Sequence, residues 1–120
     1  MSDNCIFCKI AAGQIPANKV YEDEDVLAFH DIRPIAPVHF LIIPKRHIES
    51  LLKSEANDAP LLGKMLSLAP ELAKTQGLDK GFRTIINSGP AGGQEVYHLH
   101  IHIIGGGGKI DQMANHLKSN

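Results

Sequence analysis

The sequence lacks a long apolar stretch. Its apolar runs are no longer than the four residues 40–43, whereas a membrane-spanning helix needs about 20. The first twenty residues contain Asp, Asn, Lys, Gly and Pro and no continuous apolar block, which is unlike a secretory signal. We therefore expect no membrane partner and a cytoplasmic location, in which the two cysteines stay reduced.

An excess of charge of one sign is also lacking. The chain has 12 Lys and Arg against 13 Asp and Glu, which gives a net charge of −1, and the basic residues are scattered along it. Proteins that bind nucleic acid polymers need a run of cations to displace counterions. The composition therefore argues against a nucleic acid polymer as partner and is compatible with a small anionic ligand.

No linker or internal repeat divides the chain. Its 120 residues suit one compact domain, and a chain of this size buries roughly two-thirds of its unfolded surface without disulfides or metal. We predict a single domain over residues 1–120. The four glycines at 105–108 begin a stretch, 105–120, that we expect to be a flexible tail.

Periodicity and turn residues predict an α+β domain built on an antiparallel sheet of about five strands. One main helix follows Asp58, which is expected to cap it, and runs to Gly77 with a kink or break at Pro70. A short helix is expected over residues 4–12. The predicted strands are 19–22, 26–31, 39–44, 82–87 and 95–104.

Three histidines alternate with aliphatic residues near the end of the chain. Successive residues of a strand point to opposite faces, so His98, His100 and His102 are expected to share one face. Three buried imidazoles would be costly without partners, which makes a purely structural role a poor explanation. Two chemistries fit, metal coordination and covalent catalysis by a neutral imidazole.

Neighbouring residues favour covalent catalysis. His39, on the adjacent strand, could orient a ring nitrogen of the nucleophile, and the Asn87 amide could donate to an anionic oxygen. Residues 92–94, Gly-Gly-Gln, offer backbone N–H groups with little steric bulk, which suits a phosphate.

The two cysteines, Cys5 and Cys8, have the spacing of both zinc ligands and redox pairs. A redox pair is expected at a strand-to-helix junction of a βαβ unit, which is not evident here. Tetrahedral zinc needs two more ligands, for which His47 and His98 are candidates. By spacing alone, two buried cysteines that pack as small apolar groups are about equally compatible. If His98 binds metal, catalysis is left to His39, His100 and His102.

The segment His98-Leu-His-Ile-His-Ile-Ile104 resembles the defining motif of the histidine triad (HIT) family of nucleotide hydrolases and transferases. Residues 29–32, 36–45, 81–87 and 92–98 are similar to the Hint branch of that family, the purine nucleoside phosphoramidases. The resemblance implies a HIT-like fold, a homodimer whose sheets join side by side, and a purine nucleoside 5′-monophosphoryl group bound on the triad face. It also favours a structural zinc held by Cys5, Cys8, His47 and His98, with no cofactor required for the chemistry.

The resemblance implies a role for each matching residue. His100 would be the nucleophile that takes up the nucleotidyl group, His102 would lie at the phosphate, and His39 would hold the ring of His100. Further nucleotide contacts would come from Asp31 at the ribose, Ile32 at the purine, and Asn87, Gly93, Gln94 and Glu95 at the phosphate. Glu95 stands where many Hint proteins have a serine, and the residues after 105 contain no tryptophan, unlike the tails of the best-known members.

These features predict hydrolysis of purine nucleoside 5′-phosphoramidates, or of nucleotidylated amines, to a nucleoside monophosphate through a nucleotidyl-histidine intermediate. Two alternatives share the same residues. One is hydrolysis of dinucleoside polyphosphates, which uses the same nucleophile with another leaving group. The other is a non-catalytic nucleotide-binding regulatory module.

Overall fold

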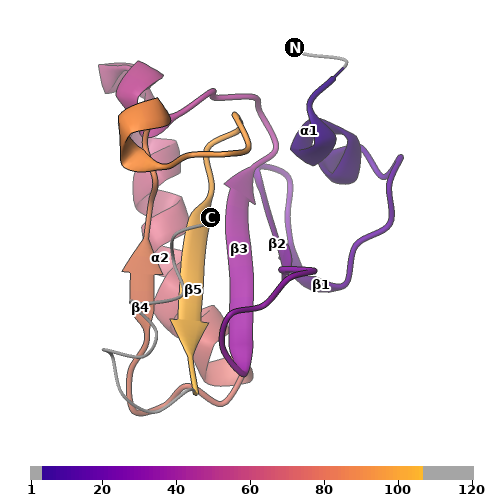
Figure 1. Ribbon diagram of the computed structural model, residues 1–120, viewed down its shortest axis with the longest axis vertical. Helices are drawn as coiled ribbons and strands as arrows, with labels where there is room; N and C mark the ends of the chain where they lie inside the picture. Colours follow the sequence, from indigo (N-terminus) through magenta and orange to yellow (C-terminus); the bar gives the residue numbers. More distant parts are fainter. Residues whose placement is uncertain (1–3, 107–120) are drawn as a thin grey trace.

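The computed structural model describes residues 4–106 and contains one five-stranded antiparallel sheet with the strand order β1-β2-β3-β5-β4 (Figure 1). It confirms the predicted α+β fold with one main helix and a short N-terminal helix. The elements, in chain order, are α1 (Ile6–Ala11), β1 (Lys19–Glu22), β2 (Val26–His30), β3 (Val38–Pro44), α2 (Ala59–Thr75), β4 (Arg83–Ile85) and β5 (Ile101–Gly105). Within the described residues, no helix has the length and apolar character needed to cross a bilayer.

Strand β3 lies at the centre of the sheet and pairs with both β2 and β5. Its register places Leu41 opposite His102 and His39 opposite Ile104. Because paired residues point to the same face of a sheet, His39, Leu41 and His102 lie on one face. The register therefore brings two of the predicted catalytic histidines together.

The two faces of the sheet bury different sets of apolar residues. Helix α2 covers one face and lies behind the sheet in Figure 1. The residues buried on that side include Val26, Ala28, Phe40, Ile42, Met65, Leu72, Ile101 and Ile103. Helix α1 packs near the other face, against Leu27, Phe29, Leu41 and Ile43. Burying each large aliphatic or aromatic side chain contributes about 1.5–3 kcal/mol, so both helices are held by their apolar faces.

Helix α1 forms close to its predicted position. Cys5 precedes its first turn, and the Cys5 thiolate or thiol sulfur accepts a hydrogen bond from the backbone N–H of Cys8 at 3.3 Å. Phe7, Cys8 and Ile10 are buried against the sheet. The same short helix thus carries both cysteines and an apolar wall.

Helix α2 lacks the break that was one of the two outcomes expected at Pro70, and it lacks the side-chain cap expected from Asp58. It runs through Pro70 without a break, although an internal proline costs about 3 kcal/mol. Ala69 and Leu72, on either side of Pro70, are buried in the core and keep the helix in place. Asp58 does not cap α2 through its side chain. Its carboxylate instead accepts hydrogen bonds from the Glu55 N–H at 2.8 Å and from the Arg46 guanidinium at 2.7 Å.

The last predicted strand is shorter than expected. Strand β5 begins only at Ile101, and residues 95–100 are irregular. A 3₁₀ turn, Pro90–Gly92, precedes them, and its glycine-rich sequence allows the positive φ of 82° at Gly93. His98 therefore lies off the sheet and is directed to a different group of residues from His102. The expected tail lies outside the described residues from position 107 onward.

Candidate active site and metal centre

The ring of His100 is held by a backbone carbonyl. Its Nδ1 lies 2.7 Å from the carbonyl oxygen of His98. Because a carbonyl can only accept, His100 Nδ1 carries the proton, and the Nε2 of the neutral ring has a lone pair. His100 is 5% exposed and lines a cavity. The arrangement gives this ring a nucleophilic nitrogen.

His102 has the opposite tautomer, which follows from a chain of hydrogen bonds through His39. The backbone N–H of Ile35 donates to His39 Nδ1 at 3.2 Å, so a neutral His39 carries its proton on Nε2. That nitrogen lies 2.9 Å from His102 Nδ1, which must then accept. His102 therefore presents an N–H at Nε2. Among the described residues this buried nitrogen has no hydrogen-bond partner, so it is suited to donate to a bound anion.

This chain corrects the expected role of His39. The resemblance implied that His39 holds the ring of His100, whereas its Nε2 bonds to His102 and the His98 carbonyl holds His100. The register explains the difference, since β3 and β5 place His39 and His102 on one face of paired strands. His39 thus fixes the tautomer of His102.

Burial keeps these imidazoles neutral. Desolvation lowers the pKa of His102 to about 3, and it is also the largest cause that lowers the pKa values of His39 and His100. Asp31 opposes the shifts of His39 and His100, because a nearby carboxylate favours the charged ring. At neutral pH the site therefore holds neutral rings with fixed donor and acceptor nitrogens.

Asp31 lies at the end of β2 beside the histidines. One carboxylate oxygen accepts the backbone N–H of Arg33 at 2.8 Å, which shapes the turn. The other lies 3.4 Å from His39 Nε2. The ligand atoms of Asp31, His39 and His102 fall within 4.8 Å of one another. This carboxylate thus lies beside the rings of His39 and His102.

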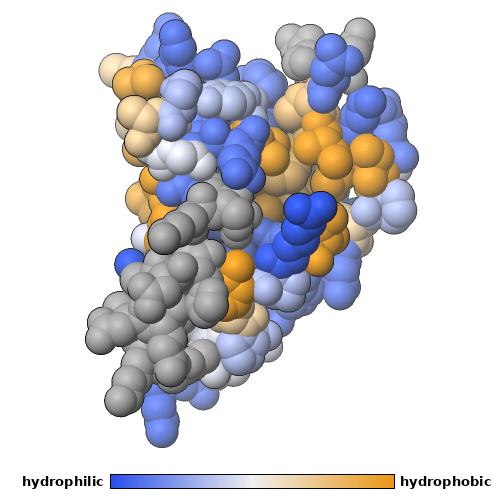
Figure 2. Space-filling model, viewed as in Figure 1, coloured by the Kyte–Doolittle hydropathy of each residue, from blue (hydrophilic) through white to orange (hydrophobic). Residues whose placement is uncertain are grey.

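A cavity of about 550 Å³ lies in front of His100 and His102. It is large enough for a small-molecule ligand. Asp31, Ile32 and Glu95, three of the predicted nucleotide contacts, line it. Apolar residues form much of the remaining wall, and Ile32 is 91% exposed at its edge. Figure 2 shows hydrophobic side chains gathered at the surface around α1, toward the upper right.

Sequence reasoning missed a large part of this wall. The residues concerned are Ile6, Phe7, Ile10, Phe29, Arg33, Leu41 and Val96. Phe7 contacts the rings of His100 and Phe29 edge-on, with centroid separations of 5.2 and 5.5 Å. The available signal was the apolar pair between the two cysteines, which a short helix turns toward the sheet.

The loop before the triad does not offer the expected backbone cradle. The N–H groups of Gly92, Gly93 and Gln94 donate to the carbonyls of Gly89 and Pro90 within the turn. The Gln94 side chain is buried and also bonds to backbone, accepting from Gly89 and donating to Glu49 and Val96 at 2.9 Å each. A tight 3₁₀ turn requires these bonds, so Gly93 and Gln94 position the loop. Asn87, like Gly93 and Gln94, is not among the residues that line the cavity.

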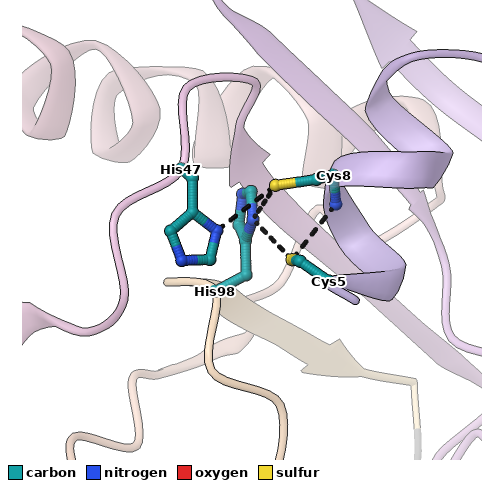
Figure 3. Close-up of side chains that lie close together, drawn as sticks. All are labelled: Cys5, Cys8, His47 and His98. Atoms are coloured by element: carbon teal, nitrogen blue, oxygen red, sulfur yellow. Dashed lines mark hydrogen bonds between the residues drawn. The ribbon is translucent and has the colours of Figure 1, made fainter. Parts of the chain in front are cut away.

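The second group of chemistry-bearing residues contains Cys5, Cys8, His47 and His98 (Figure 3). Cys8 comes from α1 and Cys5 from the N-cap position just before it, while His47 lies in the loop after β3 and His98 in the segment before β5. Cys8 Sγ lies 3.2 Å from His47 Nδ1 and 3.5 Å from His98 Nδ1, and Cys5 Sγ lies 3.3 Å from His98 Nδ1. The four candidate ligand atoms all lie within 4.8 Å of one another.

This donor set fits zinc. Two sulfurs and two imidazole nitrogens are a common tetrahedral set, in which neighbouring S and N ligands lie about 3.6 Å apart. His98 Nε2 donates to the Pro44 carbonyl at 2.7 Å, which leaves Nδ1 unprotonated and directed at the sulfurs. Burial lowers the pKa of His98 to about 4, and a neutral ring can bind metal. The predicted pairing of the two cysteines with His47 and His98 is present in the structure.

Together, these features define a class of protein, an antiparallel-sheet domain whose buried histidines face a ligand-sized cavity. The family model for the HIT domain matches residues 12–109. The chain belongs to the HIT family, as its triad sequence predicted.

Relatives and solved structures match most of the chain. Protein HitA from Neisseria gonorrhoeae is 59% identical over 103 residues, 86% of this chain and 96% of that protein. The 14 kDa zinc-binding protein of Brassica juncea is 52% identical over 103 residues, 84% of this chain and 91% of that protein. Among solved structures, a HIT family hydrolase from Legionella pneumophila has a TM-score of 0.83 and 52% identity, covering 86% of this chain and 93% of that chain. A histidine triad nucleotide-binding protein from Candida albicans has a TM-score of 0.76 and 36% identity, covering 83% and 73%.

Proposed function

We propose that the protein is a hydrolase that cleaves purine nucleoside 5′-phosphoramidates or nucleotidylated amines to a nucleoside monophosphate. One observation carries this proposal. His100 presents a lone pair, and His102 presents an N–H without a partner among the described residues, to one cavity. Attack on a phosphoryl group requires a nucleophile beside an N–H group that can donate a hydrogen bond to the anionic oxygen. The family membership and the hydrolase and nucleotide-binding relatives support it.

The first step forms a bond from His100 Nε2 to phosphorus and breaks the phosphorus–nitrogen bond. The bonding electron pair leaves with the nitrogen, which takes up a proton and departs as an amine. The Nε2–H of His102 donates to a phosphoryl oxygen as negative charge develops there. The His98 carbonyl stabilises the cationic ring of His100 through its bond to Nδ1–H. Water then attacks phosphorus, the bond from phosphorus to His100 Nε2 breaks with its electron pair returning to the ring, and the proton lost by water goes to solvent as the monophosphate leaves, which balances the proton taken up by the amine.

The cavity walls are suited to the rest of the nucleotide. Ile32 and the apolar residues Phe29 and Leu41 offer a surface for a purine ring. Asp31 offers carboxylate oxygens for the ribose hydroxyls. Gly93 and Gln94 contribute indirectly, because their turn places Glu95 at the cavity.

We further propose that Cys5, Cys8, His47 and His98 bind a structural zinc ion. The supporting observations are the mutual distances of the four ligand atoms and the bond that orients His98. The Brassica juncea relative is named as a zinc-binding protein. Zinc would stabilise α1 against the sheet, and the steps above use only the residues of the chain.

Two further parts of the proposal concern the setting of the enzyme. We expect a homodimer in which sheets join side by side, as the family resemblance implies, and light scattering of the purified protein measures this directly. We also expect a cytoplasmic location, because reduced thiols are needed to bind zinc.

One assay tests the proposed activity against its rivals. Adenosine 5′-phosphoramidate and diadenosine polyphosphates are offered side by side, and release of nucleoside monophosphate is measured. We expect faster release from the phosphoramidate, together with a transient mass increase of one nucleotidyl group on the protein. Preferred cleavage of the polyphosphates would instead identify a dinucleoside polyphosphate hydrolase. Binding of nucleotide without turnover of either would identify a non-catalytic module.

A further inference from the structure

The active-site cavity has a neighbour. A second cavity of about 440 Å³ lies beside it, and the two share Ile6, Glu95 and Val96 in their walls. Glu95 is exposed and belongs to both. Glu95 therefore lies at the boundary between the space in front of the triad and the space beyond it.

The charges around this boundary are mainly acidic. The described wall of the second cavity contains the carboxylates of Glu49 and Glu95 and no lysine or arginine. His47, in the same wall, contacts Cys8 and belongs to the metal centre. The cation of the first cavity is Arg33, beside Asp31. A negatively charged group placed next to Glu95 would be repelled, and a positively charged group would be attracted.

The position of the phosphoryl group is indicated by an independent observation. His102 is 1% exposed, and within residues 4–106 its Nε2 has no hydrogen-bond partner, although the ring lines the first cavity with His100. A phosphoryl oxygen would satisfy this donor. The apolar wall around Phe29 and Leu41 then suits the nucleoside. The remaining space, toward Glu95 and the second cavity, is available to the leaving group.

On the basis of the proposed function, we propose that Glu95 selects the leaving group and that the second cavity receives it. The preferred substrates are nucleoside phosphoramidates whose amine substituent carries a positive charge, such as an amino acid side chain or polyamine. The bonds are those of the main reaction: phosphorus bonds to His100, and nitrogen leaves with the electron pair and takes up a proton. Anionic leaving groups, including polyphosphate, are disfavoured by the carboxylate.

The test uses three adenosine 5′-phosphoramidates whose nitrogen carries an aminoalkyl, an alkyl or a carboxyalkyl chain of equal length. We expect kcat/KM for release of adenosine monophosphate to fall in that order, with about tenfold between the cationic and anionic substrates for charges several ångström apart in a hydrated site. In Glu95→Gln the ratio of kcat/KM for the cationic substrate to kcat/KM for the anionic substrate should fall severalfold. Raising the ionic strength to about 0.5 M should also reduce the wild-type ratio, because exposed charges are screened.

Two variants serve as controls. Glu24→Gln makes the same change of charge at an exposed site that lines neither cavity, and it should keep the wild-type ratio. Glu49→Gln, in the second cavity alone, should reduce the ratio less than Glu95→Gln. Equal kcat/KM for the three substrates, or an unchanged ratio in Glu95→Gln with a wild-type melting temperature, would overturn the assignment of Glu95. Absence of turnover for all three would overturn the proposed function itself, and with it this inference.

Discussion

The candidate metal centre and the candidate catalytic centre both use imidazole rings, but through different ring nitrogens. In the candidate metal centre, the Pro44 carbonyl accepts a hydrogen bond from the Nε2–H of His98, so the unprotonated Nδ1 faces the thiols. In the candidate catalytic centre, the His98 carbonyl accepts a hydrogen bond from the Nδ1–H of His100, so the unprotonated Nε2 faces the cavity. In each ring, a hydrogen bond to one backbone carbonyl thus decides which of the two nitrogens keeps a free lone pair. His98 and His100 are two residues apart, and the two candidate centres differ in which ring nitrogen the backbone holds, Nε2 in His98 and Nδ1 in His100.

The two centres are nevertheless joined by helix α1. Its cysteines belong to the metal centre, while Ile6, Phe7 and Ile10 line the active-site cavity. The Phe7 ring lies edge-on to both His98 and His100, with centroid separations of 6.0 and 5.2 Å. Substitutions can therefore show where the two centres act separately and where they act together.

The largest difference should come from removal of the nucleophile. His100→Ala is expected to lower turnover of adenosine 5′-phosphoramidate by roughly 10⁴-fold or more, because no other described ring presents a lone pair to the cavity in the same way. Zinc content should stay at the wild-type level, and nucleotide should still bind. Steady-state kinetics, metal analysis and calorimetry measure the three properties. Near-wild-type turnover in this variant would remove His100 from its proposed role.

Loss of a metal ligand should give the converse result. Cys8→Ser is expected to lose zinc and about 3–4 kcal/mol of unfolding free energy, the value for a ligand present at 100 to 1,000 times its Kd. Turnover should fall far less than in His100→Ala, since the catalytic rings keep their hydrogen bonds and only the α1 wall loosens. Metal analysis and denaturant unfolding measure the effect. Chelation of the wild-type protein, followed by added zinc, is the reversible control. A variant that retains zinc would contradict the assignment of Cys8.

The pH dependence of stability should report the buried catalytic ring. In the unfolded chain His102 protonates near its ordinary value of 6.5, whereas in the fold burial lowers its pKa to about 3. The unfolded state therefore binds more protons between these values, so stability is fullest above pH 6.5 and falls as the pH drops toward 3. The contribution is about 1.4 kcal/mol per pH unit. Burial also lowers the pKa values of His39 and His100, which face this ring beside the Asp31 carboxylate.

His102→Asn isolates this contribution. The unfolding free energy is measured by denaturant titration between pH 4 and pH 6. Its slope against pH should be smaller than in wild type by about 1.4 kcal/mol per pH unit, which corresponds to one proton fewer taken up on unfolding. Identical slopes in wild type and His102→Asn would show that His102 is not held neutral by burial.

The sequence predicted which residues gather in these two candidate centres better than it predicted how they are connected. Alternation identified the histidines, and the cysteine spacing identified the partners of His47 and His98, because both signals are local. The bond from His39 to His102 depends on the register of β3 against β5, which no local pattern specifies. The use of the Gly93 and Gln94 N–H groups within a turn was likewise hidden, because glycine suits a phosphate loop and a 3₁₀ turn equally. The late start of β5 at Ile101, which leaves His98 off the sheet, was not visible in the alternating pattern either.

The smallest effect should show the coupling between the two centres. Phe7→Leu keeps an apolar side chain in α1 but removes the edge-on contacts with His98, His100 and Phe29, which contribute about 0.5–1.5 kcal/mol per aromatic pair. We expect a melting temperature lower by about 3–6 °C, with small decreases in both zinc affinity and kcat. Phe82→Leu, on the side of the sheet covered by α2, is the matched control. It should lower the melting temperature without changing kcat or zinc affinity. If Phe7→Leu behaves like Phe82→Leu, α1 joins the two centres only by position, and each ring is held entirely by its own backbone carbonyl.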